Sequence, residues 1–164
     1  KFLKYAESYG CRIGGTAAME AARKGHIEVL EYYRSVCTQW DAEVICSAAA
    51  AGDQLECLKY VLSFGCPPCS RILENAAHAG SLECLKYAHE QGHPLSHLVV
   101  GFAASNGQMD CLVYAHEHGC PWSEYAVNMS TLYGHKECLR YCIEHGCPPY
   151  EWWLPYYAIK RMFE

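Results

Sequence analysis

Apolar residues recur along the chain in short stripes that each match one face of a helix. In the clearest segment, the first stripe is formed by Ile72, Leu73, Ala76 and Ala77. The second stripe is formed by Leu82, Cys84, Leu85 and Ala88. Both have a helical period, and Gly80 between them suits a left-handed helix stop. Gly92 and then Pro94 follow the second stripe, so the segment predicts two short helices and a break.

This two-helix unit repeats along the chain. Tyrosines mark the repeat at Tyr5, Tyr32, Tyr60, Tyr87, Tyr114 and Tyr141. All intervals are 27 residues except one of 28, which we attribute to an extra residue in Gly52-Asp53-Gln54-Leu55. A fixed period of this size is typical of stacked repeats. We therefore predict an all-α solenoid of helix-turn-helix repeats, with about five full units and a half-unit at each end, in residues 2–6 and 152–162.

The residues of the repeat resemble the ankyrin family. The best match is Ala21-Ala22-Arg23-Lys24-Gly25-His26-Ile27-Glu28-Val29-Leu30. Ankyrin units have about 33 residues, so the 27-residue unit resembles a short variant without the β-hairpin finger. Units with Glu-Cys-Leu-Lys-Tyr and Gly-Cys-Pro-Trp resemble those of large protist, algal and giant-virus arrays. The resemblance implies one ankyrin-like domain over residues 1–164, with first helices lining a concave protein-binding face. Because Lys1 opens in mid-repeat, we expect a segment of a longer chain.

Composition and motifs argue against several function classes. The net charge is −5, and acidic and basic residues are mixed, so the chain lacks the basic patch of a nucleic-acid-binding protein. No apolar run approaches the length that spans a membrane. No nucleophile elbow, phosphate-binding glycine loop or paired-carboxylate motif occurs. We expect a monomeric, cytoplasmic, non-enzymatic protein that needs no cofactor and binds another protein.

Twelve cysteines invite a disulfide or metal interpretation. One repeat position is occupied by Cys57, Cys84, Cys111 and Cys138, and by Val29 in the earliest copy. Another is occupied by Cys11, Cys66, Cys120 and Cys147, and also by Thr38 and His93. A position that accepts valine or cysteine favours a small hydrophobic residue. Regular disulfides between the two positions would leave Cys84 unpaired, so we predict packed, reduced thiols, which are typical of intracellular proteins.

Two chemical alternatives stay open. The chain could be a secreted effector that is stabilised by disulfides and binds a host protein. It could instead bind a metal or carry out redox chemistry through Cys66-Pro67-Pro68-Cys69, although no second cysteine pair of this spacing exists. Histidines recur at His89 and His116 and at His118 and His145, near the ends of second helices. Because equivalent positions in neighbouring units lie about 10 Å apart, we interpret these as exposed side chains and not as metal ligands.

Two further sets of positions vary between units. Trp40 and Trp122 share a position after the Gly-x-x turn, where we predict packing between units. The residue type also varies between units at the positions nine, five and two residues before each turn glycine, which lie opposite the buried stripe. Early units have polar or small residues there: Thr16, Glu20, Arg23, Glu43, Ser47, Ala50, Arg71, Asn75 and His78. Later units have Leu98, Phe102, Ser105, Tyr125, Met129 and Leu132, and then Trp152, Tyr156 and Ile159.

A large apolar stripe on the outward side of three units predicts a protein-binding patch, because aromatic anchors dominate interface energies. The predicted partner-binding residues are Leu98, Phe102, Tyr125, Met129, Leu132, Trp152 and Tyr156. The alternative is that the stripe is covered by a C-terminal cap of the same chain, or by residues of the longer chain that this segment lacks.

Overall fold

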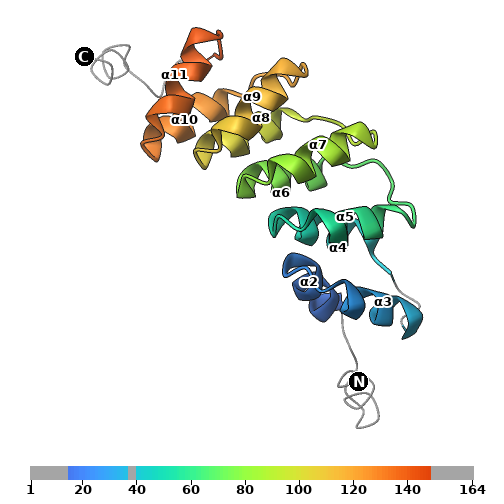
Figure 1. Cartoon of the computed structure of the whole chain (residues 1–164). Coiled ribbons are helices and arrows are strands. Elements are labelled where there is room, and N and C mark those ends of the chain that lie inside the picture. The colour runs from blue at the N-terminus through green and yellow to red at the C-terminus, as the bar shows by residue number, and fades with distance from the viewer. Residues whose placement is uncertain (1–14, 37–39, 149–164) are drawn as a thin grey trace.

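The computed structural model describes residues 15–36 and 40–148, which form a stack of helix pairs in chain order (Figure 1). The first helices are α2 (Gly15–Arg23), α4 (Ala42–Ala51), α6 (Arg71–Ala79), α8 (His97–Ser105) and α10 (Glu124–Leu132). The second helices are α3 (Ile27–Val36), α5 (Leu55–Leu62), α7 (Leu82–Glu90), α9 (Met109–Glu117) and α11 (Lys136–Glu144). The described ranges contain no strand, so the predicted all-α solenoid is confirmed. None of these helices is long and apolar enough to cross a membrane.

The buried stripes of the first helices form the centre of the stack. In α6 all four predicted core residues are fully buried. Each first helix packs against the first helix of the next unit, whereas the second helices contact one another only weakly. Alanine pairs allow the first helices to approach closely, because their side chains end at Cβ. The stack must therefore curve with the first helices on its inner side, which makes their outward residues the concave face.

The turn between the paired helices contains a left-handed residue. Gly80 and Gly107 have φ values of 81° and 71°, as the sequence predicts. In the 28-residue unit Asp53 takes this conformation, with φ of 55°, and Gly52 precedes it at −99°. A Cβ on Gly52 would collide with the backbone of Arg23, so close packing on the previous unit explains this glycine.

The extra residue therefore lengthens α4 to ten residues, whereas α6, α8 and α10 have nine. This corrects the predicted outward stripe of that unit, which was counted from Gly52. Ala50 is fully buried and Ser47 is 8% exposed. Counted from Asp53, the buried positions of α4 are those of the other units: Ile45, Cys46, Ala49 and Ala50.

Candidate protein-binding face

The predicted apolar stripe lies on α8 and α10. Leu98 and Leu132 are 36% and 58% exposed, whereas Phe102, Tyr125 and Met129 are half-buried. The half-buried residues do not project fully into solvent as the sequence predicts, and Phe102 and Tyr125 contact each other across neighbouring helices. Two more predicted residues, Trp152 and Tyr156, lie outside the described residues.

Two aromatic side chains come together across the α8–α10 junction. The Phe102 and Tyr125 rings meet edge to face, with centres 6.4 Å apart, and His78 of α6 lies 6.0 Å from Phe102 on its other side. Gly101 makes this arrangement possible, because a Cβ there would lie only 3.0 Å from Cδ1 of Tyr125. The missing side chain lets the tyrosine ring lie directly over α8. Sequence periodicity gave no indication of this role for Gly101.

These aromatic residues line a hollow of about 500 Å³ on the first-helix side. Its lining consists of His78, Phe102, Ser105, Asn106, Tyr125, Tyr133 and His135. The sequence analysis missed Tyr133, which is 61% exposed. The available signal was the variability of the residue directly before the turn glycine, which is Ala79, Asn106 and Tyr133 in successive units. Leu98, Met129 and Leu132 do not line the hollow, so the predicted stripe extends beyond it.

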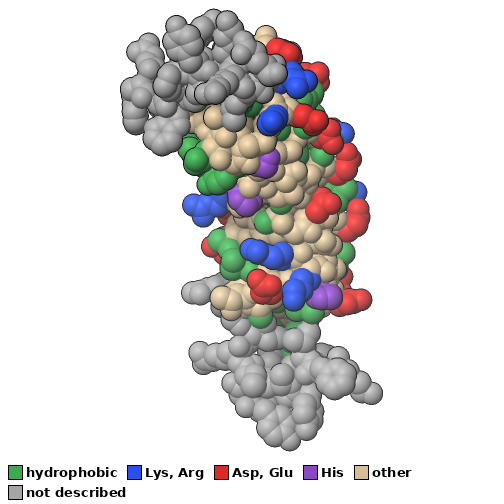
Figure 2. All heavy atoms as spheres, turned by 90° about the vertical axis from the view of Figure 1, so that its left-hand side faces the viewer, with side chains coloured by type: hydrophobic (Ala, Val, Ile, Leu, Met, Phe, Trp, Pro, Cys, Tyr) green, Lys and Arg blue, Asp and Glu red, His purple; other side chains and the backbone are tan. Residues whose placement is uncertain are grey.

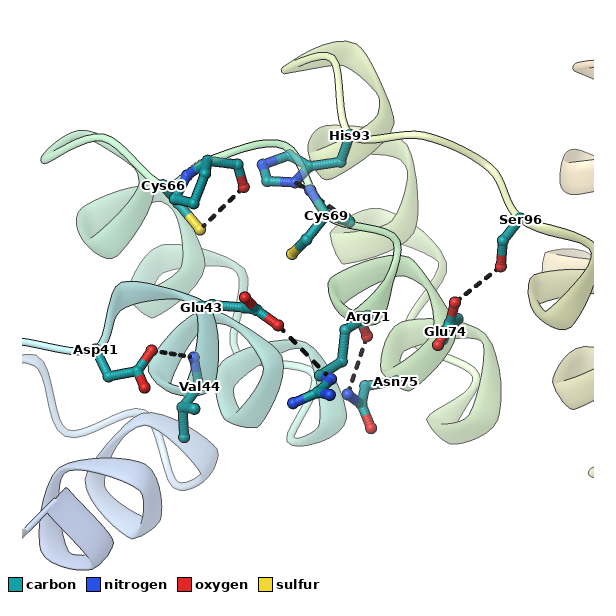
Figure 3. Close-up of polar contacts among 11 residues, drawn as sticks. Asp41, Glu43, Val44, Cys66, Cys69, Arg71, Glu74, Asn75, His93 and Ser96 are labelled. Carbon is teal, nitrogen blue, oxygen red and sulfur yellow. Dashed lines mark hydrogen bonds and ion pairs between the residues drawn. The ribbon is translucent and has the colours of Figure 1, made fainter.

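The earlier units present a different, polar surface. Arg71 of α6 forms an ion pair of 3.6 Å with Glu43 of α4, and Asn75 donates a hydrogen bond of 2.9 Å to the Arg71 carbonyl (Figure 3). Ser96 donates to the Glu74 carboxylate across the next junction, at 2.8 Å. The change from polar to aromatic surface therefore lies between α6 and α8, as the sequence predicts.

Charge is distributed unevenly around the stack. None of the residues that line the hollow is acidic, lysine or arginine. Acidic residues occupy the first turn of second helices, where they are exposed and favourably placed against the helix dipole: Glu28, Glu56, Glu83, Asp110 and Glu137. Figure 2 shows hydrophobic and histidine side chains together on one flank and acidic side chains along the opposite edge.

The arrangement of helix pairs matches solved structures. No family model and no curated protein matches the sequence. The crystal structure of the human ASB11 ankyrin repeat domain covers 80% of this chain and 69% of that chain, with a TM-score of 0.65 and 18% sequence identity. The fold is that of an ankyrin repeat domain. At 18% sequence identity the similarity establishes the fold alone. It confirms the ankyrin-like fold that the sequence predicts.

The repeated cysteines are part of the core of the helix stack. The four that share one position, Cys57, Cys84, Cys111 and Cys138, are at most 2% exposed. Burial raises the pKa of the Cys84 thiol to about 12 and that of Cys111 to about 11. Such thiols are poor nucleophiles and metal ligands, because the thiolate is the reactive form. The predicted packing of this position is confirmed.

The second repeated position connects neighbouring units. The Cys120 thiol donates to the carbonyl oxygen of Ser96 at 3.0 Å, and the Cys147 thiol donates to that of Ser123 at 3.3 Å. His93 takes the same place in its unit, where its Nδ1 accepts a hydrogen bond of 3.1 Å from the Cys69 backbone N–H (Figure 3). The buried histidine is thus accounted for by packing between units.

Cys66 departs from this pattern. Its thiol contacts the buried Cys46 thiol and lies beside Cys69. Burial is the main reason that the pKa of Cys66 rises to about 11. Figure 3 shows the side chains of Cys66 and Cys69 at the two ends of the Cys-Pro-Pro-Cys segment. Within the described ranges, no group of three or more histidine, cysteine or acidic residues could hold a metal ion.

The tryptophans pack between units, as predicted. Trp122 stacks on His116 with ring centres 4.5 Å apart, and Trp40 lies 6.0 Å from Tyr33. The histidine prediction needs correction, because His118 and His145 are exposed but His89 and His116 are half-buried.

Proposed function

We propose that this ankyrin repeat domain is a non-catalytic scaffold that binds a partner protein on its concave first-helix face. The hollow between α6, α8 and α10, with Phe102 and Tyr125 in contact at its base, is the observation that carries the proposal. A concave site with aromatic walls and few charges is typical of a place where an apolar side chain of a partner is anchored. Leu98, Met129 and Leu132 extend the surface along the stack, and the sequence adds Trp152 and Tyr156.

Rigid display supports this function. α8 packs between α6 and α10, and α10 packs against α8 and α11, so Phe102 and Tyr125 are positioned before a partner arrives. Pre-organisation lowers the entropy that is lost when the complex forms. The polar units beside the hollow, with Arg71 and Glu43, would form the rim of the interface and favour specificity over affinity.

The test compares the captured proteins of wild type with those of two matched variants. Leu132→Ser/Tyr133→Ser removes exposed apolar surface at the face, whereas Ile143→Ser removes a 37% exposed residue from second helix α11. Because Leu132 and Tyr133 are more than half exposed, their substitutions should each change the free energy of unfolding by about 0.5 kcal/mol or less, whereas Ile143→Ser should cost about 1 kcal/mol. Urea denaturation checks this assumption.

We expect wild type and Ile143→Ser to capture at least one protein that Leu132→Ser/Tyr133→Ser does not capture. With purified components, that protein should bind directly and in a defined stoichiometry. Equal capture by all three forms would refute the assigned face. Phe102→Ala is unsuitable for this comparison, because the half-buried ring also contributes to folding.

A further inference from the structure

Two equivalent clusters of two histidines and one tyrosine lie at the ends of the last described second helices. In the first, the His89 and His118 ring centres are 5.5 Å apart, and both residues contact Tyr114. The second cluster consists of His116, His145 and Tyr141, with imidazole centres 5.0 Å apart. Each pair combines one residue of the His89/His116 series with one residue of the His118/His145 series. The two histidines of each pair occupy non-equivalent repeat positions, so the separation of about 10 Å between equivalent positions in neighbouring units does not apply to them.

Hydrogen bonds orient the rings. Nδ1 of His118 lies 2.8 Å from the Tyr114 carbonyl oxygen, and Nδ1 of His145 lies 2.8 Å from that of Tyr141. A carbonyl only accepts, so each Nδ1 carries the proton and Nε2 keeps its lone pair. Nδ1 of His89 is 3.0 Å from the Tyr114 hydroxyl, which can accept in the same way. Histidines that bind metals typically donate their second ring N–H to such an oxygen.

The tyrosines also hold the histidine rings in place by stacking. The His118 and Tyr114 ring centres are 3.9 Å apart, and those of His145 and Tyr141 are 4.0 Å apart. Nδ1 of His116 is 2.8 Å from the Tyr141 hydroxyl. Rings that are fixed by stacking and by a hydrogen bond lose little freedom when they bind an ion.

The separation of each pair fits a shared ion. Two imidazoles that bind one ion at about 2.0–2.1 Å from each nitrogen have ring centres about 5 Å apart.

We propose that the His89/His118 pair and the His116/His145 pair are two separate binding sites for divalent first-row transition ions. The class is the one that prefers imidazole nitrogen, Ni²⁺, Cu²⁺ and Zn²⁺. Each site provides two protein ligands, so the remaining coordination positions are left to water. The preceding unit provides an internal comparison, because Leu62 and Gln91 stand at the histidine positions around Tyr87.

Ni²⁺ is the probe, because it prefers imidazole and does not oxidise the thiols as Cu²⁺ does. Calorimetric titration of the 164-residue chain should give two ions per molecule. His118→Asn should bind one ion. His118→Asn/His145→Asn should bind none with an affinity within about tenfold of the wild-type affinity. Asparagine keeps a donor for the carbonyl, and circular dichroism checks that the exposed replacements leave the fold intact. His97→Asn, at an exposed position outside both clusters, is the matched control and should still bind two ions.

NMR spectra of wild type locate the ions without any variant. The imidazole signals of His89, His116, His118 and His145 should broaden first as paramagnetic Ni²⁺ is added, before those of His26, His78 and His97. No heat of binding would overturn the proposal. So would two ions retained by His118→Asn/His145→Asn, or earlier broadening at His26 or His97. These outcomes are independent of partner capture on the first-helix face.

Discussion

The position of Tyr125 over Gly101 yields a quantitative prediction about the candidate face. Gly101 lies in the middle of α8, where replacement of glycine by alanine should gain about 1 kcal/mol from helix propensity. Its new Cβ would lie 3.0 Å from Tyr125 Cδ1, well inside the optimal carbon–carbon separation of about 3.5–4.0 Å. Overpacking of this kind costs about 1–3 kcal/mol. We therefore expect Gly101→Ala to lower the free energy of unfolding by about 1 kcal/mol.

Gly101→Ala should have the opposite effect on the free energy of unfolding when the Tyr125 ring is absent. In a Tyr125→Ala background the next nearest atom to the new Cβ is Ser123 Oγ at 3.5 Å, an ordinary contact. Gly101→Ala should then stabilise the protein by about 1 kcal/mol. The coupling between the two sites is the difference, about 2 kcal/mol, within the range that neighbouring residues show.

Urea denaturation of wild type, the two single variants and the double variant measures this coupling through the transition midpoints and slopes. An effect of Gly101→Ala that is the same in both backgrounds would refute the reasoning. It would show that the tyrosine ring does not lie over α8, and the hollow would lose one of its walls.

Two further predictions concern the framework. Asp53 has a left-handed backbone, with φ of 55°. Asp53→Gly should therefore raise the urea midpoint and Asp53→Val should lower it, and the free energies of unfolding of the two variants should differ by about 1–2 kcal/mol. Equal midpoints would contradict this conformation. Burial raises the pKa of Cys84 to about 12 and of Cys111 to about 11, so the folded protein keeps thiol protons that the unfolded chain releases above about pH 8.5. Their contribution is therefore fully present below about pH 8.5 and falls by about 1.4 kcal/mol per pH unit per thiol above it; denaturation at pH 7.5 and 9.5 should show the loss, and Cys84→Val/Cys111→Val should reduce it.

The sequence alone predicts the helix pairs well, because a period of 27 residues repeats the same burial requirement five times. Ile72 and Leu73, for example, are buried as their spacing requires. The one error of register arose at Gly52, since a glycine before a second helix looks like the usual left-handed stop. Only the backbone shows that Asp53 takes that conformation and that Gly52 is needed for contact with Arg23.

The candidate face was harder to predict, because its geometry depends on contacts between units. Variable positions identified Phe102 and Tyr125. The hollow also needs Gly101, because the absence of a side chain there leaves room for the Tyr125 ring. The histidine pairs show the same limit. His89 and His118 are 29 residues apart, which matches neither the helical period nor the repeat, and they meet only because successive second helices are offset.

The connection between units explains why cysteine and histidine exchange at one framework position. A 27-residue unit has little room for a hairpin between units, so the residue after the second helix must secure the junction by its side chain. Cys120 and Cys147 do so by donating to a carbonyl of the preceding unit, and His93 does so by accepting from the backbone N–H of Cys69 at the equivalent position. Thiol and imidazole are both short polar groups that reach the backbone of the preceding unit, so either serves. The cysteines at this framework position therefore follow from the short repeat, and they give no reason to expect redox chemistry there.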